Sequence, residues 1–369
     1  MTLQKTNYYI SIILPTLNEV ENISSIIKEI IELSNRNLIE IIVVDDASTD
    51  GTTNLLKKLS QKDNRIRLIN RFDRNGLSSA IKEGSLSASG DIIAIMDTDG
   101  QHKVENLYEA IEELIKTKKD LIIGSRFLNN SSIEGLSDKR KKGSSIANLL
   151  ANYSLSKNYS KLTDVMSGFM VFKSEKVLKI IERIDVNGFK FLYELLSVSN
   201  GILECKEIPL NFMPRQFGES KLDIAIVWDF SISLIHSYLK RLIPRKAISF
   251  AFVGITGVLV QLSVSYSFMW YLGFTFQQVL PLAVVVAASS NFLINNSLTF
   301  RRNRLKNKGL IIGLLKFLIV SSLPIIANVG LASSFYNLIS PNTLFSQLAG
   351  IIVVFIWNYA ASSRLVWNN

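Results

Sequence analysis

The sequence predicts two domains of different kinds, an α/β domain with a mainly parallel sheet and, after it, an all-α transmembrane domain with four helices. Two observations carry this prediction. Short apolar runs alternate with helical patterns over the first half of the chain, and such alternation is typical of a parallel α/β sheet. The last third contains two long tracts without a charged residue, and a helix that spans a bilayer needs about 20 apolar residues.

Five apolar runs in the first half have the length and composition of buried strands. In chain order they cover residues 8–14, 39–44, 66–70, 91–96 and 120–124. Segments whose apolar residues recur at helical spacing lie between them, at about 20–33, 52–61, 77–88 and 104–117. Ligands of such sheets bind beyond the carboxyl ends of the strands, so polar residues that follow a strand are the candidates for a functional site.

Polar clusters follow three of these runs: PTLNE after the first, DDASTDGT after the second and DTDGQH after the fourth. Asp97 and Asp99 alternate at a strand end, which would turn both carboxylates toward one side, and Gln101 continues the alternation. By itself this D-x-D pattern fits a polar turn as well as a metal site. No G-x-G-x-x-G or Walker pattern is present, which argues against a dinucleotide site of the Rossmann type or a P-loop.

The C-terminal third is both apolar and basic. From Ala247 to Asn369 the chain has seven basic residues and no acidic one, and charge-free tracts cover 247–300 and 317–363. Each tract is long enough for two helices with a short turn between them. A buried helical hairpin of a soluble core is the alternative for each pair. We predict four spans, near residues 248–272, 279–299, 311–338 and 344–366.

The distribution of positive charge predicts the orientation of these spans. The loop RRNRLKNK between the second and third spans carries five basic residues, whereas GFTFQQ and SPNT, which join the spans within each pair, carry none. Positively charged loops face the cytoplasm, so we expect both termini and the α/β domain to be cytoplasmic. Because the charges flank apolar blocks, they favour a membrane over nucleic acid as the partner.

A connecting segment separates the two domains, and we place the three parts at residues 1–221, 222–246 and 247–369. The apolar residues of this segment recur at roughly helical spacing and its end is basic, as in an amphipathic helix that lies in the bilayer interface. A helix that covers the soluble core is the alternative for its first turns. Cys205 is the only cysteine, so no intramolecular disulfide forms and a thiol-keeping compartment is expected.

Seven motifs together carry a resemblance to a known family. They are LPTLNEVENI, IIVVDDASTDGT, NGLSSAIKEG, IMDTDGQH, GSRF, VMSGFMVFK and RQFGESKL. In this order they resemble the polyprenol-phosphate sugar synthases, the dolichol-phosphate-mannose synthase branch of the inverting family 2 glycosyltransferases. The resemblance covers about residues 9–222 and implies a GT-A fold, which is Rossmann-like. The remaining third resembles the four-helix GtrA-like membrane domain that some of these synthases carry.

The resemblance implies a donor site at the strand ends. It assigns Asp97, Asp99 and Gln101 to a divalent metal, Mg²⁺ or Mn²⁺, because a hard cation with oxygen ligands suits the charge that develops on a diphosphate. His102 follows these residues and is not expected to be a ligand. The residues expected to bind the nucleotide are Pro15, Leu17, Glu19, Asp45, Asp46, Asp97, Arg215 and Lys221.

Two aspartates end the second predicted strand. The resemblance places one of them on the base or the ribose, and we favour Asp46. For either one, the alternative is a role in a turn or in capping a helix, because the STDGT stretch downstream also signals the start of a helix. Asp45 therefore stays a candidate beside Asp46.

The acceptor implied by the resemblance is a lipid phosphate, which needs cationic partners. The residues at the matching positions are Arg126, Arg140 and Ser144. Lys139, Lys141 and Lys142 fit either this role or a basic surface that meets anionic headgroups. Arg215 and Lys221, with Gly218 between them, are expected to close over the donor diphosphate and to exclude water. Asp99, Arg215 and Lys221 are the expected catalytic residues.

These assignments imply transfer of mannose from GDP-mannose to dolichyl or undecaprenyl phosphate on the cytosolic face. A phosphate acceptor is largely ionised near neutral pH, since its second pKa lies near about 6. We therefore expect a single displacement with inversion, no catalytic base and a β-linked product. The alternatives are a donor such as UDP-glucose or another UDP-hexose, or a translocator or binding module for lipid-linked sugars. A processive polysaccharide synthase would carry a Q-x-x-R-W segment, which is absent.

Overall fold

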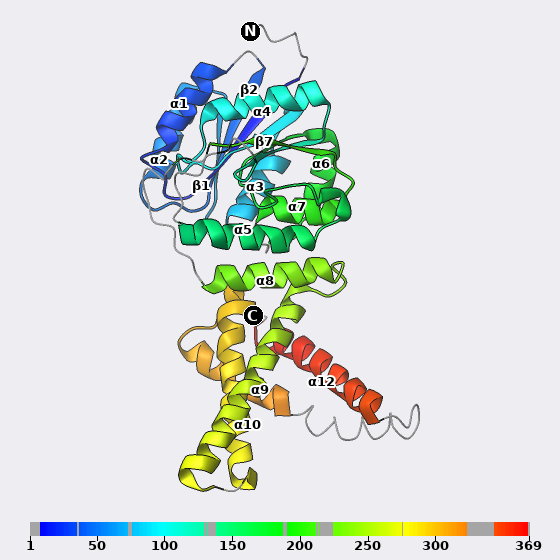
Figure 1. Ribbon diagram of the computed structural model, residues 1–369. Coiled ribbons are helices and arrows are strands. Elements are labelled where there is room, and N and C mark those ends of the chain that lie inside the picture. The colour runs from blue at the N-terminus through cyan, green and yellow to red at the C-terminus, as the bar shows by residue number, and fades with distance from the viewer. Residues whose placement is uncertain are drawn as a thin grey trace. The chain divides into compact units, whose positions relative to one another are not determined.

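The computed structural model describes residues 8–34, 37–72, 76–128, 131, 138–186, 190–211, 213, 224–274, 276–322 and 343–367. The chain forms two compact units, Met1–Tyr238 and Leu239–Asn369 (Figure 1). The boundary between them lies inside the predicted connecting segment, because the helix that begins this segment belongs to the first unit. Each unit is described separately below.

The first unit is built on a seven-stranded sheet with the order β3-β2-β1-β4-β6-β5-β7. Its strands are β1 (Ile10–Thr16), β2 (Leu38–Asp45), β3 (Ile66–Asn70), β4 (Ile92–Ile95), β5 (Leu121–Ser125), β6 (Met170–Lys173) and β7 (Cys205–Pro209). The five predicted apolar runs correspond to β1–β5. All neighbouring strands are parallel except that β6 is antiparallel to both β4 and β5. The prediction of a mainly parallel sheet is therefore confirmed.

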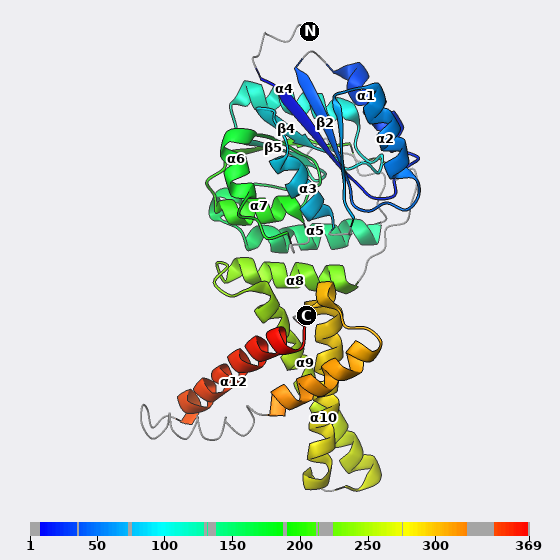
Figure 2. The same ribbon diagram turned by 180° about the vertical axis from the view of Figure 1, so that it is seen from behind.

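Helices cover both faces of this sheet (Figures 1 and 2). One face packs against α1 (Ile23–Leu33), α2 (Thr52–Lys62) and α4 (Val104–Thr117). The other packs against α3 (Leu77–Leu86), α6 (Ser174–Ile181) and α7 (Phe191–Ser199). Successive strand residues point to opposite faces: Ile12 and Leu14 enter the first core, and Ile13 enters the second. Strands that are buried on both faces read as continuous apolar runs.

The reversed strand β6 begins at the edge of the sheet where β4 and β5 end. Met170, its first residue, pairs with Ile95 of β4 and with Ile123 of β5. The chain between β5 and β6 contains α5 (Asp138–Tyr153) and a short 3₁₀ turn at Lys157–Tyr159. Residues just before β6 therefore reach the same edge as the residues that follow the parallel strands.

Helix α8 (Ile224–Tyr238) is packed against the first unit by one of its faces. The Ser237 hydroxyl lies 2.9 Å from the Ser197 hydroxyl of α7 and donates to the Ser154 carbonyl at 3.2 Å. Val227 and Tyr238, by contrast, are more than half exposed. The alternative of a helix that covers the soluble core thus holds for one face of α8, and its exposed side remains apolar.

The second unit is helical. Its helices are α9 (Arg245–Leu272), α10 (Phe276–Ile294), a segment over residues 308–322 and α12 (Thr343–Leu365), with a π-helical turn at Asn295–Thr299 and a 3₁₀ turn at Arg301–Asn303. In the described part of the chain, two helical stretches are long and apolar enough to cross a membrane, Arg245–Leu272 and Pro281–Thr299. The predicted third span extends into residues outside the described ranges.

Candidate active site

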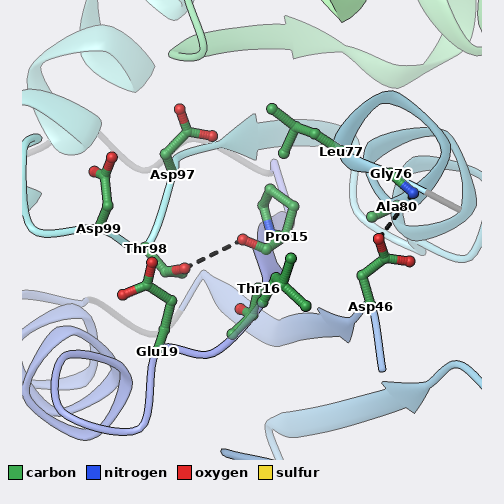
Figure 3. Close-up of a pocket in the computed structure, with 11 residues that line it drawn as sticks. Pro15, Thr16, Glu19, Asp46, Gly76, Leu77, Ala80, Asp97, Thr98 and Asp99 are labelled. Carbon is green, nitrogen blue, oxygen red and sulfur yellow. Dashed lines mark hydrogen bonds between the residues drawn. The ribbon is translucent and has the colours of Figure 1, made fainter. Parts of the chain in front are cut away.

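A cavity of about 280 Å³ opens at the carboxyl ends of β1, β2 and β4 (Figure 3). Among the candidate nucleotide-binding residues, five contribute to its lining: Pro15, Leu17, Glu19, Asp46 and Asp97. The rest of the described lining is Thr16, Gly76, Leu77, Ala80, Thr98 and Asp99. Residues from three loops and from the start of α3, all distant in sequence, thus share one cavity. It lies at the edge of the sheet where the topology predicts ligand binding.

The loops after β1 and β2 are bonded to each other. Asn18 adopts a left-handed backbone with φ of 57°. Its amide N–H donates to the Ser48 hydroxyl and its side-chain oxygen accepts from the Thr49 N–H, both at 2.8 Å. The Glu19 N–H donates to the Thr52 hydroxyl at 3.0 Å, and the Glu19 carbonyl accepts the first amides of α1. These bonds fix the backbone that presents Leu17 and Glu19 to the cavity.

The two aspartates that end β2 have different surroundings. The carboxylate of Asp46 lines the cavity, where it accepts the Gly76 N–H at 2.8 Å and one Arg71 N–H at 2.8 Å. Asp45 is fully buried, and its carboxylate accepts the hydroxyls of Ser48 in the following loop and of Thr53 in the first turn of α2. The separation follows from the strand period, because neighbouring side chains point to opposite sides. The structure therefore brings Asp46, and not Asp45, to the cavity.

Asp97 and Asp99 lie together at the end of β4, on the same side of the cavity as Glu19 (Figure 3). Gly100 turns the chain with φ of 75°, and the Gln101 N–H donates to Asp99 Oδ1 at 3.2 Å. The Gln101 side-chain nitrogen donates to the Met213 carbonyl at 3.2 Å, and the Met213 N–H donates to the Gln101 carbonyl at 3.0 Å. If Gln101 binds a metal, the ligand is therefore the oxygen of its side-chain amide.

The donor set at this edge fits a hard divalent cation that shares its coordination with a substrate. Among the described residues, no group of three or more His, Cys, Asp or Glu side chains is arranged to hold a metal. Mg²⁺ is commonly bound by one or two carboxylates plus substrate phosphate oxygens and water. Asp97 and Asp99 supply such a pair of carboxylates, so the residues present are compatible with a metal that binds together with a diphosphate.

Gly168 is a site residue that the sequence did not single out. It precedes β6, and a Cβ atom on it would lie 3.0 Å from Asp97 Cγ and closer still to Asp97 Oδ2. Only glycine leaves room for the carboxylate in its present position. The signal in the sequence was the Ser-Gly step within VMSGFMVFK, but its meaning depends on β6 running antiparallel beside β4.

Arg126 follows β5 and is held by Asp164. Its Nε and Nη2 atoms donate to the two carboxylate oxygens at 2.7 and 2.9 Å. Burial opposes the charge on Arg126, but the adjacent Asp164 outweighs burial and raises the pKa of the guanidinium. Glu207 supports this pair by accepting the Asp164 N–H at 2.8 Å. The position of Arg126 is thus set by a buried bidentate ion pair.

Lys190 is a second cation of this region and was also not predicted. It precedes α7 in an extended conformation. Burial lowers the pKa of its ammonium group, and the charge of Arg126 lowers it further. The carboxylates of Asp97, Asp164 and Asp99 act in the opposite direction. Lys190 is therefore within electrostatic range of Arg126 and of the carboxylates of Asp97 and Asp99. The sequence signal was a lysine between phenylalanines in NGFKFL.

His102 is buried beside the same loop. Its ring lies 5.5 Å from the ring of Phe169, measured between centroids. Burial lowers the pKa of His102 to about 4, so the imidazole is neutral at pH 7. The role of His102 stays a prediction.

Several candidate residues lie at or beyond the limits of the described chain. Arg140 and Ser144 belong to α5, but the side chain of Arg140 is outside the described part. Lys139 and Lys141 share this limit. Arg215, Gly218 and Lys221 lie outside the described residues altogether. Their roles remain predictions.

Two family models match separate parts of this chain. Residues 11–179 match the glycosyl transferase family 2, and residues 249–367 match the GtrA/DPMS transmembrane domain. A solved structure of glucosyl-3-phosphoglycerate synthase from Mycobacterium tuberculosis, in complex with Mn²⁺, uridine diphosphate and glucosyl-3-phosphoglycerate, is similar with a TM-score of 0.46 and 20% identity. The similarity covers 64% of this chain and 81% of that one.

Two curated relatives carry the same name. The dolichol-phosphate mannosyltransferase of Pyrococcus furiosus is 31% identical over 369 residues, which covers 97% of this chain and 99% of the relative. The dolichol-phosphate mannosyltransferase of Mycosarcoma maydis is 31% identical over 242 residues, which covers 65% of this chain and 76% of the relative. The chain is therefore a membrane-bound glycosyltransferase and belongs to the family 2 glycosyltransferases of the dolichol-phosphate mannosyltransferase type.

Proposed function

We propose that this enzyme transfers mannose from GDP-mannose to a polyprenyl phosphate at the cytosolic face of a membrane that it crosses with four helices. The observation that carries the proposal is the cavity at the strand ends, which gathers Asp97 and Asp99 beside Glu19 and opposite Asp46. The names of the curated relatives support mannose as the sugar and dolichyl phosphate as the class of acceptor. The RRNRLKNK loop supports the orientation.

The charges beside the cavity suit a metal-bound diphosphate. Three carboxylates, Asp97, Asp99 and Asp164, face two cations, Arg126 and Lys190, so their formal sum is −1. A divalent metal, Mg²⁺ or Mn²⁺, would supply two positive charges to offset the charge that develops on the leaving diphosphate. Bound beside Asp97 and Asp99, the metal would stabilise the charge on the leaving diphosphate more strongly in the transition state than in the ground state.

The chain's own residues would bind the donor and the acceptor and orient them for the transfer. Asp46 and the backbone around Leu17 line the part of the cavity assigned to the nucleoside. Arg126, whose guanidinium is held by Asp164, is proposed to bind the acceptor phosphate. Arg140 and Ser144 are proposed to share that phosphate, and Arg215 and Lys221 to close over the diphosphate. One oxygen of the acceptor phosphate attacks the anomeric carbon as the bond to the nucleoside diphosphate breaks. Because that oxygen is already ionised, no base is required.

The test is a donor screen with the purified full chain in detergent. GDP-mannose and UDP-glucose would each be offered with polyprenyl phosphate, with Mg²⁺, Mn²⁺ or excess chelator. We expect a mannolipid from GDP-mannose, loss of product with chelator and loss in Asp99→Asn. Glu112→Gln, which changes an exposed carboxylate on α4, serves as the control and should retain activity.

The outcomes separate the parts of the proposal. A glucolipid in place of a mannolipid would replace the donor but keep the acceptor and the mechanism. A product that is α-linked from an α-linked donor would exclude the single displacement. Full activity in chelator would exclude a required metal. If no donor gave a lipid product, the result would support a binding or translocation function instead.

A further inference from the structure

A second cavity, of about 220 Å³, lies in the C-terminal unit and is lined by residues near the start of α9 and the end of α12. Its lining combines two cations with polar and aromatic side chains. The lining residues are Lys246, Phe300, Asn303, Tyr359, Ser363, Arg364 and Trp367. The proposed sugar transfer uses none of them.

An aromatic stack forms the floor of this cavity. The rings of Phe300 and Trp367 lie 4.2 Å apart between centroids and are within 9° of parallel. Both side chains are buried, and Trp367 Nε1 donates to Asn296 Oδ1 at 3.1 Å. The same Asn296 side chain exchanges two hydrogen bonds with the backbone of Leu305, at 2.8 and 3.1 Å. The floor is therefore fixed by packing and by hydrogen bonds before any ligand arrives.

The floor also borders an interruption of the α-helical ladder. A π-helical turn spans Asn295–Thr299, and Phe300 follows it directly. Such turns widen a helix locally and occur frequently at functional sites. Here the turn moves the chain from α10 into the 3₁₀ segment that carries Asn303 to the rim of the cavity.

The cavity is electropositive. Lys246 and Arg364 are exposed, and Lys246 Nζ lies 5.9 Å from the centroid of the Phe300 ring. From Leu239 to Asn369 the sequence has eleven basic residues and no acidic one, so no carboxylate side chain of this unit can neutralise either cation. The helix dipole gives the start of α9 a positive partial charge and the end of α12 a negative one, each of about half a unit. Because these two partial charges offset each other, the two side-chain cations decide the sign of the electrostatic potential in the cavity.

We infer that this cavity binds the phosphate group of an anionic membrane lipid. Its volume equals that of roughly seven waters, which admits a phosphate and the first atoms of its ester. Guanidinium and ammonium groups are the usual partners of phosphate oxygens, and aromatic rings are enriched where a transmembrane helix meets the headgroups. Basic pockets between transmembrane helices on the cytoplasmic side bind lipid headgroups in this way.

Calorimetric titration of the full chain in detergent with short-chain phosphatidylglycerol tests this site. The variant Lys246→Gln/Arg364→Gln removes both cations from the lining. The control Lys306→Gln/Lys308→Gln removes two exposed cations of the same unit that lie outside the lining. We expect the Kd to rise at least about tenfold, or about 1.4 kcal/mol, in the first variant and to change less than about twofold in the control.

Competition then distinguishes the sources of the phosphate. Displacement of phosphatidylglycerol by farnesyl phosphate would show that the site accepts lipid monoesters, and displacement by inorganic phosphate would show that the phosphate alone suffices. Absence of binding in the wild-type chain, or equal losses in both double variants, would overturn the inference, because equal losses indicate diffuse attraction by charge. The titration measures binding and not turnover, so its result is independent of the proposed donor and acceptor.

Discussion

A methyl group at position 168 should displace the carboxylate of Asp97. A Cβ atom there would lie 3.0 Å from Asp97 Cγ and closer to Oδ2, whereas carbon atoms pack at about 3.5–4.0 Å, so the carboxylate must retreat by roughly 0.5–1 Å. A misplacement of about 1 Å at a reacting centre can cost about 10²-fold in rate. We therefore expect Gly168→Ala to lower kcat/KM by roughly 10- to 100-fold and to raise the metal concentration needed for half-maximal rate.

The assay is the initial rate of sugar transfer over a series of Mn²⁺ concentrations, with thermal melting measured in parallel. Two variants with the same change serve as controls. Gly309→Ala adds its methyl in open space, and Gly84→Ala places a Cβ 2.6 Å from Ile13 Cγ2 in the core, away from Asp97. The first should behave as wild type, and the second should melt earlier without a change in metal dependence. Wild-type rates and metal dependence in Gly168→Ala would refute the assigned packing.

Three further predictions follow from the buried charges and the single thiol. Lys190→Met should lower kcat/KM by about 10²-fold. It should not lower the melting temperature, because partial burial already opposes the charge of Lys190. The exposed control Lys57→Met should change neither quantity. Asp164→Asn should cost about 3–5 kcal/mol in unfolding free energy, because it leaves the buried Arg126 without its carboxylate, and an unchanged denaturation midpoint would exclude this pairing. Burial raises the pKa of Cys205 to about 12. At pH 8 the thiolate fraction of the folded chain is then on the order of 10⁻⁴, and alkylation should be slow. Unfolding returns the pKa to about 8.5 and should make alkylation fast. Rapid labelling of the native chain would contradict that burial.

Strands β1, β2, β4 and β5 could be predicted because each is buried on both faces and reads as a nearly continuous apolar run. The edge strand β3 is exposed at Arg67 and Asn70, and its prediction rested on its short run of isoleucine and leucine. Strand β6 has only four residues and lies within VMSGFMVFK, where nothing local encodes its direction. The antiparallel pairing comes from the tertiary fold, which overrides local pattern. The two domains were visible from charge alone, since no carboxylate occurs after Ala247.

The candidate site could be predicted where its residues directly follow a strand. Asp97, Asp99 and Asp46 belong to this class, and all three line the cavity. Gly168 and Lys190 do not, because they approach Asp97 only through β6 and α7, which are far from it in the sequence. The structure was needed to choose between Asp45 and Asp46, because it shows which of the two adjacent side chains points into the cavity. In a sequence, two adjacent carboxylates look alike.

The reversed strand has a consequence for how such an enzyme can diversify. Because β5 ends and β6 begins at one edge of the sheet, the chain between them leaves and returns at the same place, as a closed excursion that carries α5. Residues can be inserted into this excursion, or removed from it, without shifting the register of β1, β2 or β4. Changes in the part of the excursion that carries α5 can therefore alter the half assigned to the acceptor while the strands of the nucleotide half keep their register. The last residues of the excursion have less freedom, because Gly168 packs against Asp97 of the nucleotide half.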